Sequence, residues 1–198
     1  MEFKKELLEQ VAKDGAVGAA EAFSKLLKQE TLVESSDVQS VSLAEAYAVL
    51  KPSQKHAIVV YSQVIAGLPV KGVSFLTIDR DQALVLVDAL NQRASGTTGI
   101  LKDIDRSAIK ETLNILSNAF LNALAVISEI ELGLGAPTMI TSARLDDVVD
   151  FNMKTTDPTE ELAVIFKTVI RTQEILIETN LFLIFSEELY KSMVQATV

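Results

Sequence analysis

The sequence contains no cysteine, no tryptophan and only one histidine, His56. Without cysteine there is no disulfide scaffold, no thiol nucleophile and no zinc site built on thiolates. A single histidine leaves little for a histidine-based metal site or for a Ser-His-Asp triad. We interpret His56, which opens a predicted strand, as an ordinary surface or strand-edge residue.

Positive charge is also scarce. Asp and Glu number 27 against 18 Lys and Arg, which gives a formal net charge of −9. Nucleic-acid binding needs a basic face to neutralise phosphates, and a base-stacking surface needs more aromatic residues than the 6% present here. The sequence therefore predicts partners other than nucleic acid.

Long apolar runs are missing. The longest uncharged stretch lies between Glu111 and Glu129, spans 17 residues and carries three asparagines, whereas a membrane span needs about 20 mostly apolar residues. The first ten residues mix charged and apolar side chains, unlike a signal peptide. We expect a cytoplasmic protein without a membrane span.

The chain does have ample material for a core, because 48% of its 198 residues are hydrophobic. Periodicity, caps and turn residues predict helices and hairpins in alternation. A capping box of Asp79 and Gln82 is expected to open one helix, and Ser186 to cap another. The expected elements are a helix over 3–28, a hairpin of 56–66 with 73–78, a helix over 81–90, a helix over 107–130, a hairpin of 162–170 with 175–185, and a last helix to about 195.

Two halves of the chain repeat the same order of elements. Matching residues recur at an offset of 101 or 107 positions: Ala22, Leu26 and Ser40 with Ala123, Ile127 and Thr141, and Phe75-Leu76 with Phe182-Leu183. We predict one domain over 1–198, made of half-repeats at about 1–95 and 103–198 with a linker at 94–102. The expected fold class is α/β (α+β), with two helix–strand–hairpin–helix halves that share a largely antiparallel sheet about an approximate two-fold axis and pack helices against it.

One face of the helix predicted over 107–130 is unusually polar. Ser107, Glu111, Asn114, Asn118 and Asn122 fall within an arc of about 80°. The opposite stripe is apolar and consists of Ile109, Leu113, Leu116, Phe120, Leu124 and Ile127. Asparagine is a poor helix-interior residue. The face is therefore either a row of solvated positions or a site, since local misfits tend to mark sites.

The spacing of the residues on this face matches a known sequence signature. Ser107, Glu111, Asn114 and Pro137 fit the pattern Ser/Asp-x3-Glu-x2-Asn-x22-Pro, which a chain of this composition contains by chance about 0.001 times. The pattern is the signature of the CheC/CheX/FliY family of chemotaxis phosphatases. The segment 81–125 and the tandem halves also resemble that family, and the chain looks most like its CheC branch.

The resemblance implies a function. The substrate would be the aspartyl phosphate of a phosphorylated CheY-type response regulator, which supplies its own Mg²⁺, so no cofactor bound by this chain is expected. Asn114 would orient the attacking water, and Glu111 would pair with the regulator's active-site lysine. Asn118 would extend the partner-binding face or simply be solvated, while Ser107 and Pro137 would have structural roles.

A second function class stays open beside the phosphatase. CheC proteins also bind CheD, the receptor-modifying deamidase, so the chain is alternatively an adaptor for CheD, for phosphorylated CheY or for both. In the first half, Gln10, Lys13 and Ser36 occupy the positions of the signature Glu, Asn and Pro. Lysine cannot accept a hydrogen bond as an amide does. We therefore expect one functional site, in the second half.

Two further clusters have plain interpretations. Asp146, Asp147 and Asp150 suggest Mg²⁺ binding but have no other ligand pattern beside them, so a solvated helix start is favoured. The segment Gly133-Leu134-Gly135 is expected to be a helix C-cap and turn.

Overall fold

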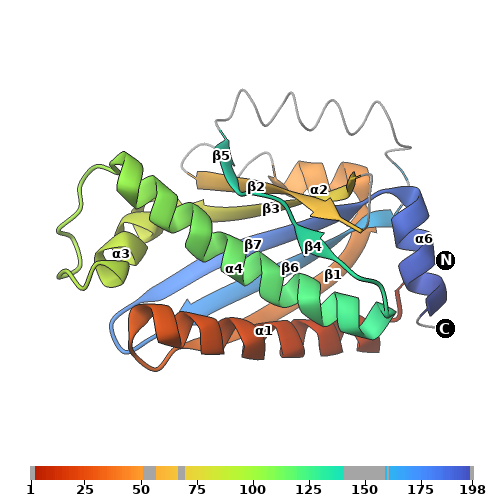
Figure 1. Cartoon of the computed structure of the whole chain (residues 1–198), viewed down its shortest axis with the longest axis horizontal. Coiled ribbons are helices and arrows are strands. Elements are labelled where there is room, and N and C mark those ends of the chain that lie inside the picture. The colour runs from red at the N-terminus through yellow and green to blue at the C-terminus, as the bar shows by residue number, and fades with distance from the viewer. Residues whose placement is uncertain (1–2, 51–56, 67–69, 141–158, 160, 197–198) are drawn as a thin grey trace.

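The computed structural model describes residues 3–50, 57–66, 70–140, 159 and 161–196. Helices and strands alternate in a mixed α/β arrangement (Figure 1). Their order is α1 (Lys5–Leu27), β1 (Leu32–Ser42), α2 (Leu43–Leu50), β2 (Ala57–Ile65), β3 (Val70–Asp79), α3 (Arg80–Leu90), α4 (Asp103–Ser128), β4 (Gly133–Leu134), β5 (Thr138–Ile140), β6 (Glu161–Arg171), β7 (Leu176–Phe185) and α6 (Glu187–Ala196).

The strands form one seven-stranded sheet in the order β1-β6-β7-β3-β2-β4, with β5 also pairing with β2. Every pairing is antiparallel. The two hairpins expected from the sequence are β2–β3 and β6–β7, and they meet at the centre of the sheet through β3 and β7. The predicted fold class, with a shared and largely antiparallel sheet, is confirmed.

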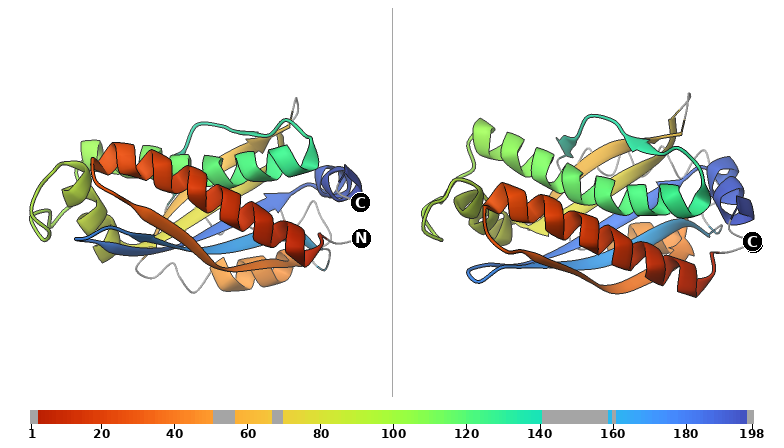
Figure 2. Two further views of the ribbon diagram at one scale, coloured as in Figure 1. Left: turned by 90° about the horizontal axis from the view of Figure 1, so that it is seen from below. Right: turned by 60° about the horizontal axis from the view of Figure 1, so that its bottom comes forward.

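Helices cover both faces of the sheet. Figure 2 shows α1 and α4 side by side on one face and α2 on the other, and Figure 1 shows α3 and α6 at opposite ends. Strand side chains alternate between the two faces: Val60 and Val64 of β2 belong to the cluster under α1 and α4, and Val59 to the cluster under α2. The sheet is thus buried on both sides.

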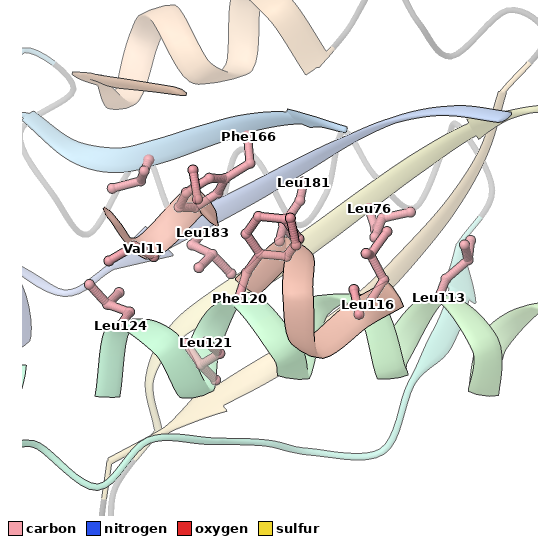
Figure 3. Close-up of a cluster of buried hydrophobic side chains, with 14 of the residues drawn as sticks. Val11, Leu76, Leu113, Leu116, Phe120, Leu121, Leu124, Phe166, Leu181 and Leu183 are labelled. Atoms are coloured by element: carbon pink, nitrogen blue, oxygen red, sulfur yellow. The ribbon is translucent and has the colours of Figure 1, made fainter. Parts of the chain in front are cut away.

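The larger core lies between the sheet and the two long helices (Figure 3). Phe120 of α4 is fully buried, and its ring lies 4.9 Å from the ring of Phe166 on β6. Val11 of α1 enters the same cluster. Burying one such side chain stabilises a fold by about 1.5–3 kcal/mol. The apolar stripe of α4 therefore fixes which of its faces remains available to solvent.

The two halves are related by the offsets found in the sequence. Phe75 and Phe182, which match in the sequence at the offset of 107, are direct partners across β3 and β7, as an approximate two-fold axis between these strands would require. The long helices end in equivalent ways, because Lys28 and Glu129, 101 residues apart, both have φ of 54°. Each helix thus stops with a left-handed residue.

Two helices begin earlier along the chain than expected. Helix α4 begins at Asp103, four residues before Ser107, where the side chain of Asp105 accepts a hydrogen bond from the backbone N–H of Lys102. The acidic side chains near this end also suit the helix dipole. Helix α3 starts at Arg80, one residue before the expected start, and the expected cap Asp79 is confirmed, because its side chain accepts a hydrogen bond from the backbone N–H of Asp81.

The expected capping box is wrong in its second member, because the Gln82 side chain instead accepts a hydrogen bond from the Glu178 backbone of β7. The turn expected at Gly133-Leu134-Gly135 is also wrong. Gly133 and Leu134 form β4, which pairs with the end of β2, because a free strand edge is available there.

Two expectations fall outside the described residues: that on His56, and that of a solvated helix start at Asp146, Asp147 and Asp150. Among the helices that the structure describes, none has the length and apolar character needed to cross a membrane.

Candidate functional site

Helix α4 carries the polar face along its outer side, opposite the buried stripe. Glu111 and Asn122 are exposed, while Asn114 and Asn118 are half-buried. The sequence predicted an exposed Glu111 and an exposed Asn114 on the same face. The shared face and the exposed carboxylate are observed, but the amide of Asn114 is only partly open to solvent.

The amide of Asn114 is held by the sheet. Its Oδ1 accepts a hydrogen bond of 3.1 Å from the hydroxyl of Ser62 on β2. Ser62 is only 3% exposed. One turn later, Nδ2 of Asn118 donates to the backbone carbonyl of Asn114 at 2.9 Å. The side chain of Asn118 is therefore engaged in a hydrogen bond within α4. The side chain of Asn114 is held by Ser62 at the boundary between core and surface.

A groove of about 450 Å³ adjoins the first turns of α4. Arg106, Ser107 and Lys110 line it from the helix, and residues at the start of β2 and in β5 close the other side. Ser107 is exposed on the second turn of α4, and Pro137 is half-buried immediately before β5. The groove thus brings Ser107 close to the residues that follow Pro137, with the cations Arg106 and Lys110 on its α4 side.

Ser62 is the site residue that sequence reasoning missed. It lies between Val60 and Val64 on the strand face that packs toward α4. A hydroxyl in an otherwise apolar alternating row is a detectable signal, because a buried polar group needs a hydrogen-bond partner. What the pattern does not indicate is which helix residue supplies that partner.

The equivalent place in the first half has different chemistry. Gln10 is exposed and donates a 2.8 Å hydrogen bond to Asp14, and Lys13 is an exposed cation. Ser36, at the proline position of the signature, lies in β1. A groove of about 500 Å³ follows α1 and β1, with charges of both signs along it. The carboxylate–amide pair is found only on α4.

The strand residue beneath this first-half position also differs. Tyr61 pairs with Phe75 in one hairpin and Ile165 with Phe182 in the other, so the equivalence of the two phenylalanines makes β2 and β6 correspond at an offset of 104. The counterpart of Ser62 is therefore Phe166, which is fully buried. The position on β6 that corresponds to Ser62 therefore lacks the hydroxyl, and the corresponding positions on α1 lack the Glu and Asn.

Within the described ranges of the chain, no three His, Cys, Asp or Glu side chains gather as they would around a metal ion. The groups available on α4 are a carboxylate, amides and a hydroxyl. Such groups can bind a partner and orient a water molecule through hydrogen bonds.

Comparison with known proteins gives both sequence and fold relatives. No family model matches the chain. A Halobacterium salinarum protein named "Putative CheY-P phosphatase CheC1" is 22% identical over 192 residues, which cover 94% of this chain and 92% of that protein.

Solved structures share the fold at low sequence identity. FliY from Thermotoga maritima superposes with a TM-score of 0.67 at 17% identity, covering 100% of this chain and 98% of that one. The FliM middle domain from Vibrio alginolyticus has a TM-score of 0.64 at 15% identity, covering 94% and 99%. The full-length sequence similarity to a CheC protein and the fold shared with FliY agree with the resemblance that the Ser107–Pro137 signature carries.

Proposed function

We propose that the chain is a phosphatase that hydrolyses the aspartyl phosphate of a CheY-type response regulator. The observation that carries the proposal is the placement of Glu111 and Asn114 three residues apart on one face of α4, with the carboxylate exposed and the amide anchored at the surface. The substrate class is supported by the name of the Halobacterium relative. A substrate of this kind places the protein in the cytoplasm.

Hydrolysis of an aspartyl phosphate requires a correctly positioned water molecule more than a strongly activated nucleophile. Phosphoryl transfer has a loose transition state, and a water held in line with the bond to be broken needs little nucleophilic push. The water oxygen forms a bond to phosphorus as the bond from phosphorus to the aspartyl oxygen breaks, releasing the carboxylate and inorganic phosphate. The water proton passes to the phosphate or to solvent. In this proposal the amide of Asn114 orients that water.

Glu111 has the role of fixing the register of the complex. Its exposed carboxylate lies about one turn before Asn114, which suits an ion pair with a lysine of the regulator. An exposed ion pair contributes little, but a pair that becomes desolvated on docking contributes to both affinity and orientation. Mg²⁺ enters as part of the phosphorylated regulator.

The direct test is phosphate release from a CheY-type regulator loaded with acetyl phosphate and Mg²⁺. The wild-type chain should accelerate release, and Asn114→Ala should lower the accelerated rate by about 100-fold because orientation of the water is lost. Asn122→Ala is the matched control, since it removes an exposed asparagine further along the same face. No acceleration by the wild-type chain would overturn the proposal.

An adaptor that binds CheD, phosphorylated regulator or both is the second candidate. It is favoured by the loss of the Glu-x2-Asn pair from the first half, where Gln10 and Lys13 stand instead. Under this alternative the chain binds phosphorylated regulator with negligible turnover. Measuring CheD binding in the presence and absence of phosphorylated regulator, beside the release assay, separates the two functions.

A further inference from the structure

We propose that Ser62 is a positioning residue that sets the orientation of the Asn114 amide. The inference rests on the proposed function, in which that amide orients the attacking water. It assigns a role to a residue outside the Ser107–Pro137 signature, on a strand that is distant in sequence from α4. Three features of the structure support it.

The first feature is the surroundings of the hydroxyl. Ser62 lies in the buried β2 row that faces α4, between Val60 and Val64, and is 3% exposed. Its Oγ donates to Oδ1 of Asn114 at 3.1 Å. Because an unpaired hydroxyl at this depth would carry a desolvation cost, the core favours keeping this bond formed.

The second feature is what the bond does to the amide. The terminal torsion of asparagine is broad and roughly two-fold, so a free Asn side chain exchanges its oxygen and nitrogen positions. With Oδ1 held against β2, one of these orientations is selected before any partner arrives. The N–H groups and the second lone pair of Oδ1 then have defined directions for a water molecule.

The third feature is the backbone around Asn114. Asn118 donates its Nδ2 to the Asn114 carbonyl at 2.9 Å, on the turn that follows. The side chain and the main chain of Asn114 are thus each held by a neighbour. Ordering a side chain on binding costs conformational entropy, and a side chain ordered in advance avoids that cost.

The corresponding positions on α1 and β6 show the converse arrangement. The position equivalent to Asn114 is Lys13, and the position equivalent to Ser62 is the buried Phe166. The hydroxyl and the amide are therefore present together on β2 and α4 and absent together from the corresponding positions on β6 and α1. This pairing is what a functional partnership between Ser62 and Asn114 predicts.

The test compares two buried serines in the full chain. Ser74 of β3 is the direct cross-strand partner of Ser62 and is 2% exposed, so Ser74→Ala removes a hydroxyl at the same depth without touching Asn114. Ser62→Ala should lower the kcat for phosphate release by about tenfold, the scale of one lost hydrogen bond, and leave KM unchanged because Glu111 still docks the regulator. Ser74→Ala should change neither constant.

Two further measurements isolate the partnership. In an Asn114→Ala background, Ser62→Ala should have no additional effect on the residual rate, since the group it orients is gone. Independently of activity, the side-chain amide resonances of Asn114 in a ¹⁵N-labelled chain should shift in Ser62→Ala and not in Ser74→Ala. A shift confined to Ser62→Ala supports the bond.

The outcomes distinguish this inference from the function on which it rests. An active wild-type chain in which Ser62→Ala matches Ser74→Ala in kcat overturns the role of Ser62 and leaves the phosphatase intact. A wild-type chain without activity overturns the phosphatase and, with it, the catalytic role of Ser62. Unchanged Asn114 amide resonances in Ser62→Ala overturn the positioning bond itself.

Discussion

Gly15 of α1 lies so close to Phe120 of α4 that a Cβ atom at position 15 would stand 2.7 Å from Cδ1 of the ring and 2.9 Å from the Phe120 Cα atom. The two long helices are in direct contact at this point, and Phe120 continues from there to the ring of Phe166 on the sheet. A residue without a side chain is therefore required where the helices approach most closely.

The first prediction concerns this contact. Gly15→Ala should destabilise the fold by about 1–3 kcal/mol, because the added methyl group forces the helices or the ring to shift. Equilibrium urea unfolding followed by circular dichroism measures the change.

Gly18 is the matched control on the same helix. A Cβ atom there would meet only the Cβ of Ala119, at the ordinary distance of 3.7 Å. Gly18→Ala should therefore stabilise the chain by about 0.5–1 kcal/mol through helix propensity. Equal effects of the two substitutions would contradict the close approach at Gly15.

The second prediction concerns docking. Glu111→Ala should weaken binding of a phosphorylated CheY-type regulator by about tenfold, because it removes the proposed partner of the regulator's lysine. Fluorescence anisotropy with a labelled regulator and a stable phosphoryl analogue measures the Kd. Glu21→Ala, which removes an exposed carboxylate from α1, should leave the Kd unchanged. A similar loss in both variants would indicate a general charge effect and not a specific contact.

The third prediction concerns the first half. Introducing Gln10→Glu and Lys13→Asn into an Asn114→Ala chain restores the residue pair on α1 but not the hydroxyl beneath it, because the counterpart of Ser62 is Phe166. Phosphate release should therefore stay at least about tenfold below the wild-type rate. Recovery of the full wild-type rate would show that the pair alone is sufficient.

The fourth prediction concerns the loop between α3 and α4. Asp88 is buried, and its carboxylate accepts hydrogen bonds from the backbone N–H of Thr97 and from the backbone N–H and hydroxyl of Thr98. Desolvation by burial raises the pKa of Asp88, but these hydrogen bonds together outweigh it and hold the pKa below its usual value. Asp88→Asn should destabilise the fold by about 1–3 kcal/mol at pH 7.

The sign of the pH dependence follows from the lowered pKa of Asp88. The stability that its ionised form contributes is fully present above the unfolded-state pKa of about 3.9, and it is lost as pH falls through the lower folded-state pKa. The difference in unfolding free energy between wild type and Asp88→Asn should therefore shrink as pH falls below about 4. Asp81→Asn, at an exposed position of the same helix, serves as the control; a difference that stays constant with pH would contradict the prediction.

Helix α4 shows which features a sequence pattern predicts and which it does not. Helical spacing placed Glu111 and Asn114 on one face, and that holds because side-chain direction in a helix depends only on position along it. The sequence pattern predicts the start of this helix at Ser107, four residues too late. The true start at Asp103 depends on the Asp105 side chain, which accepts a hydrogen bond from the backbone N–H of Lys102. Caps made by residues inside the first turn are less visible than the periodicity that follows them.

Local periodicity and matching residues at a constant offset are enough to predict the two hairpins, the long helices and the repeat that relates Phe75 to Phe182. Only the tertiary structure decided that Gly15 is a contact point with Phe120, that Gly133 and Leu134 complete a sheet edge, and that Ser62 holds Asn114. Each of these joins segments far apart in the chain. Their distances depend on how the helices cross the sheet, and that crossing is set by packing of the whole core and not by any local pattern.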